Sequence, residues 1–148
     1  MIRLLIAILM LGGGISAQAD QKIWSALVLA SNPEAGARPA EPPADLASYA
    51  PRLLRAFKGK YQQFEILGSA TKEMGGNQQE RWLVPSPTFM VGVQAKPEGD
   101  EYRIQLELFQ EKRRLIQADT KLKMQSPIFI CGPKHARGQL IVVFEIRP

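Results

Sequence analysis

The chain has 148 residues, with 19 Lys and Arg against 14 Asp and Glu, a formal net charge of +5, and 45% hydrophobic residues. That length is enough for one domain that buries a core without disulfide support, and a single cysteine cannot form an internal bridge. The positive charge is too modest to require a nucleic-acid partner.

The N-terminus has the order of a signal peptide. Arg3 supplies the positive region, residues 4–11 form an apolar run, and Ala17-Gln18-Ala19 is a small-residue cleavage site. The apolar run is shorter than the ~20 residues that span a bilayer. A lipoprotein would need a cysteine at the cleavage site to carry the lipid, and the only cysteine in the sequence is Cys131. We therefore expect residues 1–19 to be removed. Residues 20–148 should then form a single exported domain, soluble, periplasmic or secreted, and not a lipoprotein.

The first segment of this domain, residues 23–29, is apolar at both odd and even positions. That pattern predicts a strand covered on both faces, inside a sheet rather than at its edge. Residues 32–44 follow with four prolines and are expected to be an extended connection.

A helix is predicted next, because apolar residues recur at spacings of three and four as far as Phe57. Asp45 is the expected N-cap and Gly59 the expected end. Pro51 lies inside the pattern and should kink the helix or start it afresh, since proline lacks an N–H group and crowds the preceding turn.

From Tyr61 onward the pattern becomes extended, with turns rich in Gly and Pro between short strands. The clearest alternation places Arg103, Gln105 and Glu107 on one side of a strand, which predicts one wet face. The predicted strands cover residues 61–72, 81–84, 89–95, 102–108, 115–124, 128–130 and 140–146. The fold class is thus α+β, predominantly β: an antiparallel sheet or sandwich of about seven to eight strands with one N-terminal helix packed against it. The first strand is expected beside the last one, in the middle of a sheet.

Basic residues gather in four predicted places: the helix, one hairpin tip, the strand positions Lys121 and Lys123, and the last turn. If they meet in space, they would attract polyanions such as anionic glycans or lipid headgroups, whereas scattered cations serve only solvation. The candidate binding residues are Arg52, Arg55, Lys112, Arg113, Arg114, Lys134, His135 and Arg137.

Cys131 and His135 are the two candidates for nucleophilic chemistry, four residues apart across a turn. A thiol–imidazole pair needs the base within hydrogen-bond reach, and a buried cysteine that fills the core is the commoner outcome. No ligand-like spacing predicts a metal site, and we expect no catalytic residue and no cofactor.

Aromatic side chains offer an alternative binding surface. Trp82, Tyr61 and Tyr102 could form a platform for sugar or peptide, although core packing is the better interpretation. An exposed edge strand could also accept a partner's strand.

Several segments together resemble a group of small exported bacterial proteins that is known only as a domain of unknown function. They are the run Tyr61–Ser69, the run Ser126–Ile130, Gly132-Pro133 and the run Gly138–Val143, after a Pro-rich stretch and a Leu/Arg helix. The resemblance implies export and supplies no catalytic residue.

These patterns favour a non-enzymatic exported module that contacts a protein partner in the cell envelope. Two alternatives remain open at this point: a binder of anionic envelope glycan or lipid through the basic clusters, and a small thiol enzyme built on Cys131 and His135.

Overall fold

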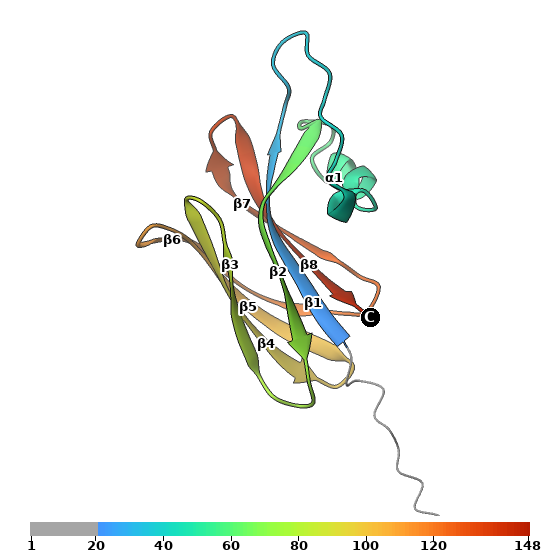
Figure 1. Ribbon diagram of the computed structural model, residues 1–148, viewed down its shortest axis with the longest axis vertical. Coiled ribbons are helices and arrows are strands. Elements are labelled where there is room, and N and C mark those ends of the chain that lie inside the picture. The colour runs from blue at the N-terminus through green and yellow to red at the C-terminus, as the bar shows by residue number, and fades with distance from the viewer. Residues whose placement is uncertain (1–20) are drawn as a thin grey trace, which may run out of the picture.

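A computed structural model describes residues 21–148, so the predicted signal peptide lies outside the described residues. Two four-stranded antiparallel sheets pack face to face, and a short helical segment covers the outer side of one of them (Figure 1). The predicted α+β, predominantly β fold is confirmed.

Sheet A has the spatial order β2-β1-β8-β7, so β1 and β8 occupy its centre. Both strands are buried along nearly their whole length because one face meets sheet B and the other meets the helix. The predicted central position of the first and last strands is therefore confirmed. The four strands are β1 (Gln21–Ser31), β2 (Gln63–Met74), β7 (Ile128–His135) and β8 (Gly138–Arg147).

Sheet B is a meander in which each strand pairs with the next one along the chain. One of its hairpins turns at Glu111 and Lys112, where Glu111 takes a left-handed conformation with φ 54° in place of a glycine. The four strands are β3 (Glu80–Pro85), β4 (Phe89–Glu98), β5 (Glu101–Gln110) and β6 (Arg113–Leu122).

The helical segment differs from the prediction. A short 3₁₀ turn, η1 (Ala44–Leu46), precedes a separate helix, α1 (Ala50–Ala56), which has Pro51 in its first turn. Proline suits this place because the N–H group it lacks would have no partner inside the helix. Asp45 was expected to cap a single helix, but its side chain makes no capping hydrogen bond and instead lies 3.5 Å from the Arg147 guanidinium.

Two apolar cores result. The first lies between the sheets and includes Leu27, Leu106 and Phe144. The second lies between sheet A and the helical segment, and it is aromatic: Trp24 stacks on Tyr49 with ring centroids 6.5 Å apart. Within residues 21–148, no comparable layer covers the outer side of sheet B.

Candidate functional site

The outer face of sheet B is built from the alternate residues of four strands. Arg103, Gln105 and Glu107 of β5 point outward, which confirms the predicted wet face, while Leu106 between them is buried. The register places Leu83 of β3, Gly92 of β4, Glu107 and Gln117 of β6 in one row across the sheet.

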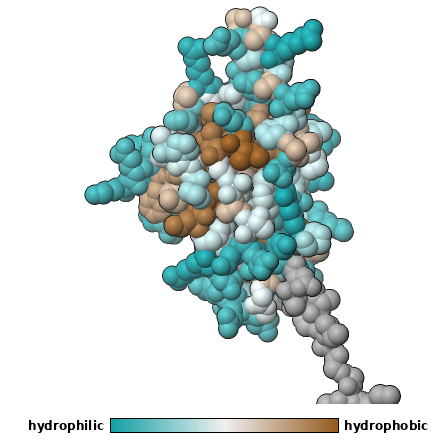
Figure 2. All heavy atoms as spheres, in the orientation of Figure 1, coloured by the Kyte–Doolittle hydropathy of each residue, from teal (hydrophilic) through white to brown (hydrophobic). Residues whose placement is uncertain are grey.

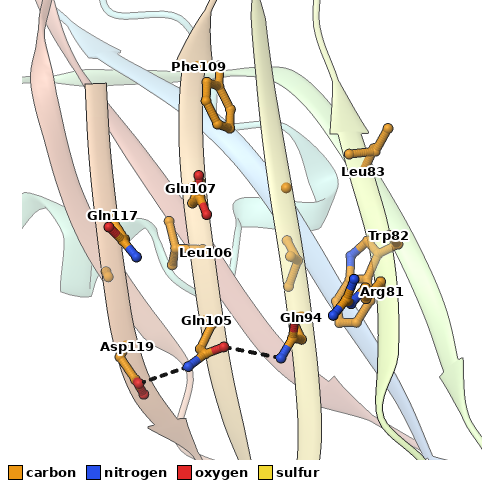
Figure 3. A pocket seen from close by; sticks show the side chains of 13 residues that line it. Arg81, Trp82, Leu83, Gln94, Gln105, Leu106, Glu107, Phe109, Gln117 and Asp119 are labelled. Carbon is orange, nitrogen blue, oxygen red and sulfur yellow. Dashed lines mark hydrogen bonds between the residues drawn. The ribbon is translucent and has the colours of Figure 1, made fainter. Parts of the chain in front are cut away.

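A hollow of about 710 Å³ lies on this face (Figure 3). This volume is within the ~300–1,000 Å³ that is usual for ligand-binding sites. Gly92 is one of its lining residues, and we call the backbone of β4 at Gly92 its floor. Its rim includes Leu83 and Phe109 on the apolar side and Gln94, Gln105 and Asp119 on the polar side. We call it the sheet B hollow.

Nothing within residues 21–148 requires Gly92 to be glycine. A Cβ atom placed there would meet nothing nearer than Leu83 Cδ2, at 3.9 Å, and the register on both sides of β4 is continuous, without a bulge. The other glycines inside strands each leave room for a neighbouring part of the chain: Gly68 for Pro85, Gly132 for Leu140 and Gly138 for Ala30. A glycine in a regular strand marks close approach of another group, and at Gly92 that group is not supplied by residues 21–148.

Apolar side chains flank the floor. Leu83 is 59% exposed, more than any other large hydrophobic side chain in the described chain. Phe109 is half-buried one row further along β5. Figure 2 shows apolar surface over the upper part of β3, on the left of the view. Such exposure costs solvation free energy and is typical of a contact surface.

The polar side of the hollow is a chain of hydrogen bonds. Gln94 Nε2 donates to Gln105 Oε1 over 3.1 Å, and Gln105 Nε2 donates to Asp119 Oδ2 over 3.2 Å (Figure 3). Arg103 completes it with two nitrogen atoms, Nε at 3.1 Å and Nη2 at 3.0 Å from the Asp119 carboxylate. The hydrogen bonds from Arg103 and then Gln105 hold the pKa of Asp119 below its usual range. These side chains are therefore oriented before any ligand arrives.

The three residues of the predicted aromatic platform do not come together on this face, although Trp82 is one of the lining residues of the hollow. Trp82 donates its indole N–H to Ser25 Oγ of β1 over 2.9 Å and packs against the core between the sheets. Tyr61 and Tyr102 are 4% and 5% exposed and belong to the two cores. Core packing, the preferred interpretation, is confirmed for all three.

Two of the four basic clusters lie at the same end of the sandwich. Phe89 connects them, because it pairs with Gln110 at the base of the β5–β6 tip and its ring lies 4.8 Å from the His135 ring in the β7–β8 hairpin. Figure 1 shows both tips on the left of the view, with the β3–β4 turn near them. Lys112, Arg113, Lys134 and Arg137 are exposed there.

The remaining predicted basic residues do not join these tips. Arg52 and Arg55 are exposed on α1, in the layer on the far side of sheet A. Arg114 lies 3.9 Å from Glu107, which is a lining residue of the sheet B hollow. The eight candidates thus divide between three places.

Cys131 and His135 lie on opposite faces of sheet A. Cys131 pairs with Ile141, whose side chain faces the helical segment, whereas the His135 ring packs against Phe89 of sheet B. The expectation that Cys131 is buried is wrong: β7 is an edge strand, α1 does not cover this part of it, and the thiol is exposed. The two side chains do not form a nucleophile–base pair in this structure.

The described part of the chain contains no cluster of side chains suited to hold a metal ion. Across residues 21–148, no group of three or more His, Cys, Asp or Glu side chains is arranged to hold a metal ion. Within the same range, no helix is long and apolar enough to cross a membrane.

No family model, curated protein or solved structure matches this chain. Residue chemistry and geometry are therefore the basis on which a function can be assigned.

The sheet B hollow is the site that the sequence alone did not reveal. Alternation along β5 predicts a wet face. The sequence does not show that Gly92 leaves a hollow there, because this depends on the pairing that places Leu83 and Glu107 on either side of it. The strand register, not any single motif, assembles the site.

Proposed function

We propose that this protein is a non-enzymatic, exported binding module that holds a protein partner from the cell envelope on the outer face of sheet B. The observation that carries the proposal is Gly92, which opens a hollow in the middle of a regular strand although no neighbour within residues 21–148 needs the space. A partner that covers this hollow would supply the missing contact.

The composition of the face supports a protein partner. Protein interfaces combine an apolar centre with a polar rim, and their binding energy is concentrated in a few well-packed anchors. Leu83 and Phe109 provide apolar area beside the hollow, while the pre-oriented chain from Gln94 to Asp119 provides hydrogen-bonding groups at its rim. Little side-chain entropy would be lost on binding, since these polar groups already restrain one another.

Site-specific photo-crosslinking in living cells tests the proposal. A crosslinking side chain at Leu83 should give one discrete protein adduct, and the same side chain at Arg52, exposed on α1, should not. The Gly92→Val variant should lose the Leu83 adduct because its side chain fills the hollow. No protein adduct at Leu83, or equal adducts at both positions, would refute the assignment of this face.

A second candidate function rests on the hairpin tips. Among residues 21–148, Lys112, Arg113, Lys134 and Arg137 form no ion pair, since no carboxylate oxygen lies within 4.0 Å of their charged nitrogens. At the opposite end of sheet B, by contrast, basic side chains such as Lys123 are paired with glutamates. Unpaired cations at one end favour contact with an anionic glycan or lipid surface.

Sedimentation with isolated envelopes distinguishes this candidate. The double variant Lys112→Glu/Lys134→Glu should lose binding at low salt, and the control Arg52→Glu/Arg55→Glu, with the same change in charge on α1, should retain it. Equal losses would mean that only net charge matters. Binding that persists in the tip variant would exclude the tips as the contact.

A further inference from the structure

We infer that the side chain seated in the sheet B hollow is a tryptophan or tyrosine of the partner, with its ring lying flat on Gly92. This inference rests on the proposed function and specifies the chemistry of the contact. It is carried by three features of the hollow: its bare floor, its apolar walls and its acceptor groups.

The bare floor suits a flat ring. With no Cβ at Gly92, a planar group can rest directly on the backbone of β4, at a depth that no other residue type would allow. Aromatic side chains cover strand glycines inside β-sheets in the same way, because the ring shields the exposed peptide groups. Here the covering ring would come from another molecule.

The walls suit an aromatic group as well. Leu83 and Phe109 stand at the apolar side of the floor, so a ring on Gly92 would contact one aliphatic and one aromatic side chain. Aromatic pairs add ~0.5–1.5 kcal/mol beyond the area they bury. Tryptophan and tyrosine are also the residues that most often anchor protein interfaces.

The polar side of the hollow selects a ring that carries a donor. Gln94 Nε2 donates a hydrogen bond to Gln105 Oε1. No donor within residues 21–148 bonds to the Oε1 atom of Gln94. The Glu107 carboxylate lies beside the floor and contacts Arg114 only at 3.9 Å. These acceptors are complementary to the positive edge of an aromatic ring and to an indole N–H or a phenol O–H, whereas leucine or phenylalanine would leave them without a donor.

A sugar ring fits the hollow less well. Sugars stack on exposed aromatic faces. Among residues 21–148, the aromatic residues that line the hollow are Phe109 and Trp82, and the indole N–H of Trp82 is already bonded to Ser25. A saccharide ligand is therefore the alternative that the experiment must separate.

The test is a titration of the isotopically labelled protein, followed through its amide resonances by NMR. The probes are N-acetyl-tryptophanamide, its indole N-methyl derivative, N-acetyl-leucinamide and a trisaccharide of N-acetylglucosamine. The tryptophan and leucine probes carry no net charge, so a difference in their binding does not come from attraction between net charges. The two indole probes differ only in the N–H donor.

We expect the tryptophan probe to shift the resonances of Leu83, Gly92 and Glu107, with a dissociation constant in the millimolar range that is usual for so small a ligand. The N-methyl probe should bind at least about threefold more weakly because it lacks the donor, and the leucine probe weaker still. Gly92→Val should abolish the response. Gly75→Val, another glycine with open space around it but located in the β2–β3 turn, should leave it unchanged.

The other outcomes overturn the inference. Equal binding of the tryptophan and leucine probes would remove the aromatic preference, and equal binding of the two indole probes would remove the role of the acceptors. A response to the trisaccharide alone would assign the hollow to a glycan. If Leu83 still crosslinks a protein while no aromatic probe binds, this inference fails and the proposed function stands; if no protein is crosslinked, the function itself fails.

Discussion

Gly92 and Gly68 show how differently the same residue type can act within one sandwich. A side chain at Gly68 would collide with the Pro85 carbonyl of β3, so the fold requires glycine there. A side chain at Gly92 would enter open space. The first glycine permits two strands to approach each other, and the second leaves a surface incomplete.

Substitution of Gly92 by alanine should raise the free energy of unfolding by ~0.5–1 kcal/mol, because glycine inside a strand loses more conformational entropy on folding than alanine. Urea denaturation followed by tryptophan fluorescence measures this change. The matched variant Gly68→Ala should be destabilised. A loss of stability in Gly92→Ala would mean that this glycine serves the fold and that the hollow is incidental.

Asp119 predicts a pH effect that is confined to acid. Its pKa is lowered in the folded state by hydrogen bonds from Arg103 and Gln105, so its contribution to stability is present above the pKa of the unfolded chain and is lost as the pH falls through the lower, folded value. NMR titration of the carboxyl carbon should find the depressed pKa. Arg103→Gln should raise it toward the ordinary range, and an unchanged pKa in that variant would contradict the assigned cause.

At the scale of elements, the helical layer depends on packing rather than on intrinsic helix stability. α1 has seven residues and no side-chain cap, which is too short for a stable isolated helix. Leu53 is fully buried against sheet A, and Arg147 holds the preceding turn through Asp45 while lying 4.2 Å from the Trp24 ring centroid. Sheet A therefore positions the helix.

Two adjacent leucines test this view. Leu53→Ala should lower the free energy of unfolding by ~2–5 kcal/mol, since it leaves a cavity in the second core. Leu54→Ala, at a position that is 37% exposed, should change it by less than ~0.5 kcal/mol. Thermal unfolding monitored by circular dichroism measures both. Equal effects would indicate that the helix is not held through its buried face.

The elements also show which sequence signals sufficed. β1 and β8 were identified as central because their apolar residues occupy both faces, a direct consequence of burial on two sides. The start of α1 was ambiguous because Pro51 is compatible with either a kink or a first turn. The exposure of Cys131 could not be predicted, because it depends on where a distant helix stops covering an edge strand.

At the scale of the whole molecule, three layers leave two unlike outer surfaces. The helical segment covers sheet A, while the outer face of sheet B carries the hollow and meets the basic tips at one end. The basic residues were visible in the sequence, but their division between α1, the tips and Glu107 was not, since it depends on the strand order. The sheet B hollow also depends on the strand order, so the site was less predictable than the fold.

The central pairing of β1 with β8 also has a consequence for how the chain reaches this state. β1 pairs on one side with β2, the next strand along the chain, but its partner on the other side is β8, which is synthesised after all the other described strands. Contacts between distant parts of a chain slow folding, to ~milliseconds or seconds for sandwiches. A nascent chain would therefore leave one edge of β1 unpaired, and the centre of sheet A incomplete, until β8 has been synthesised.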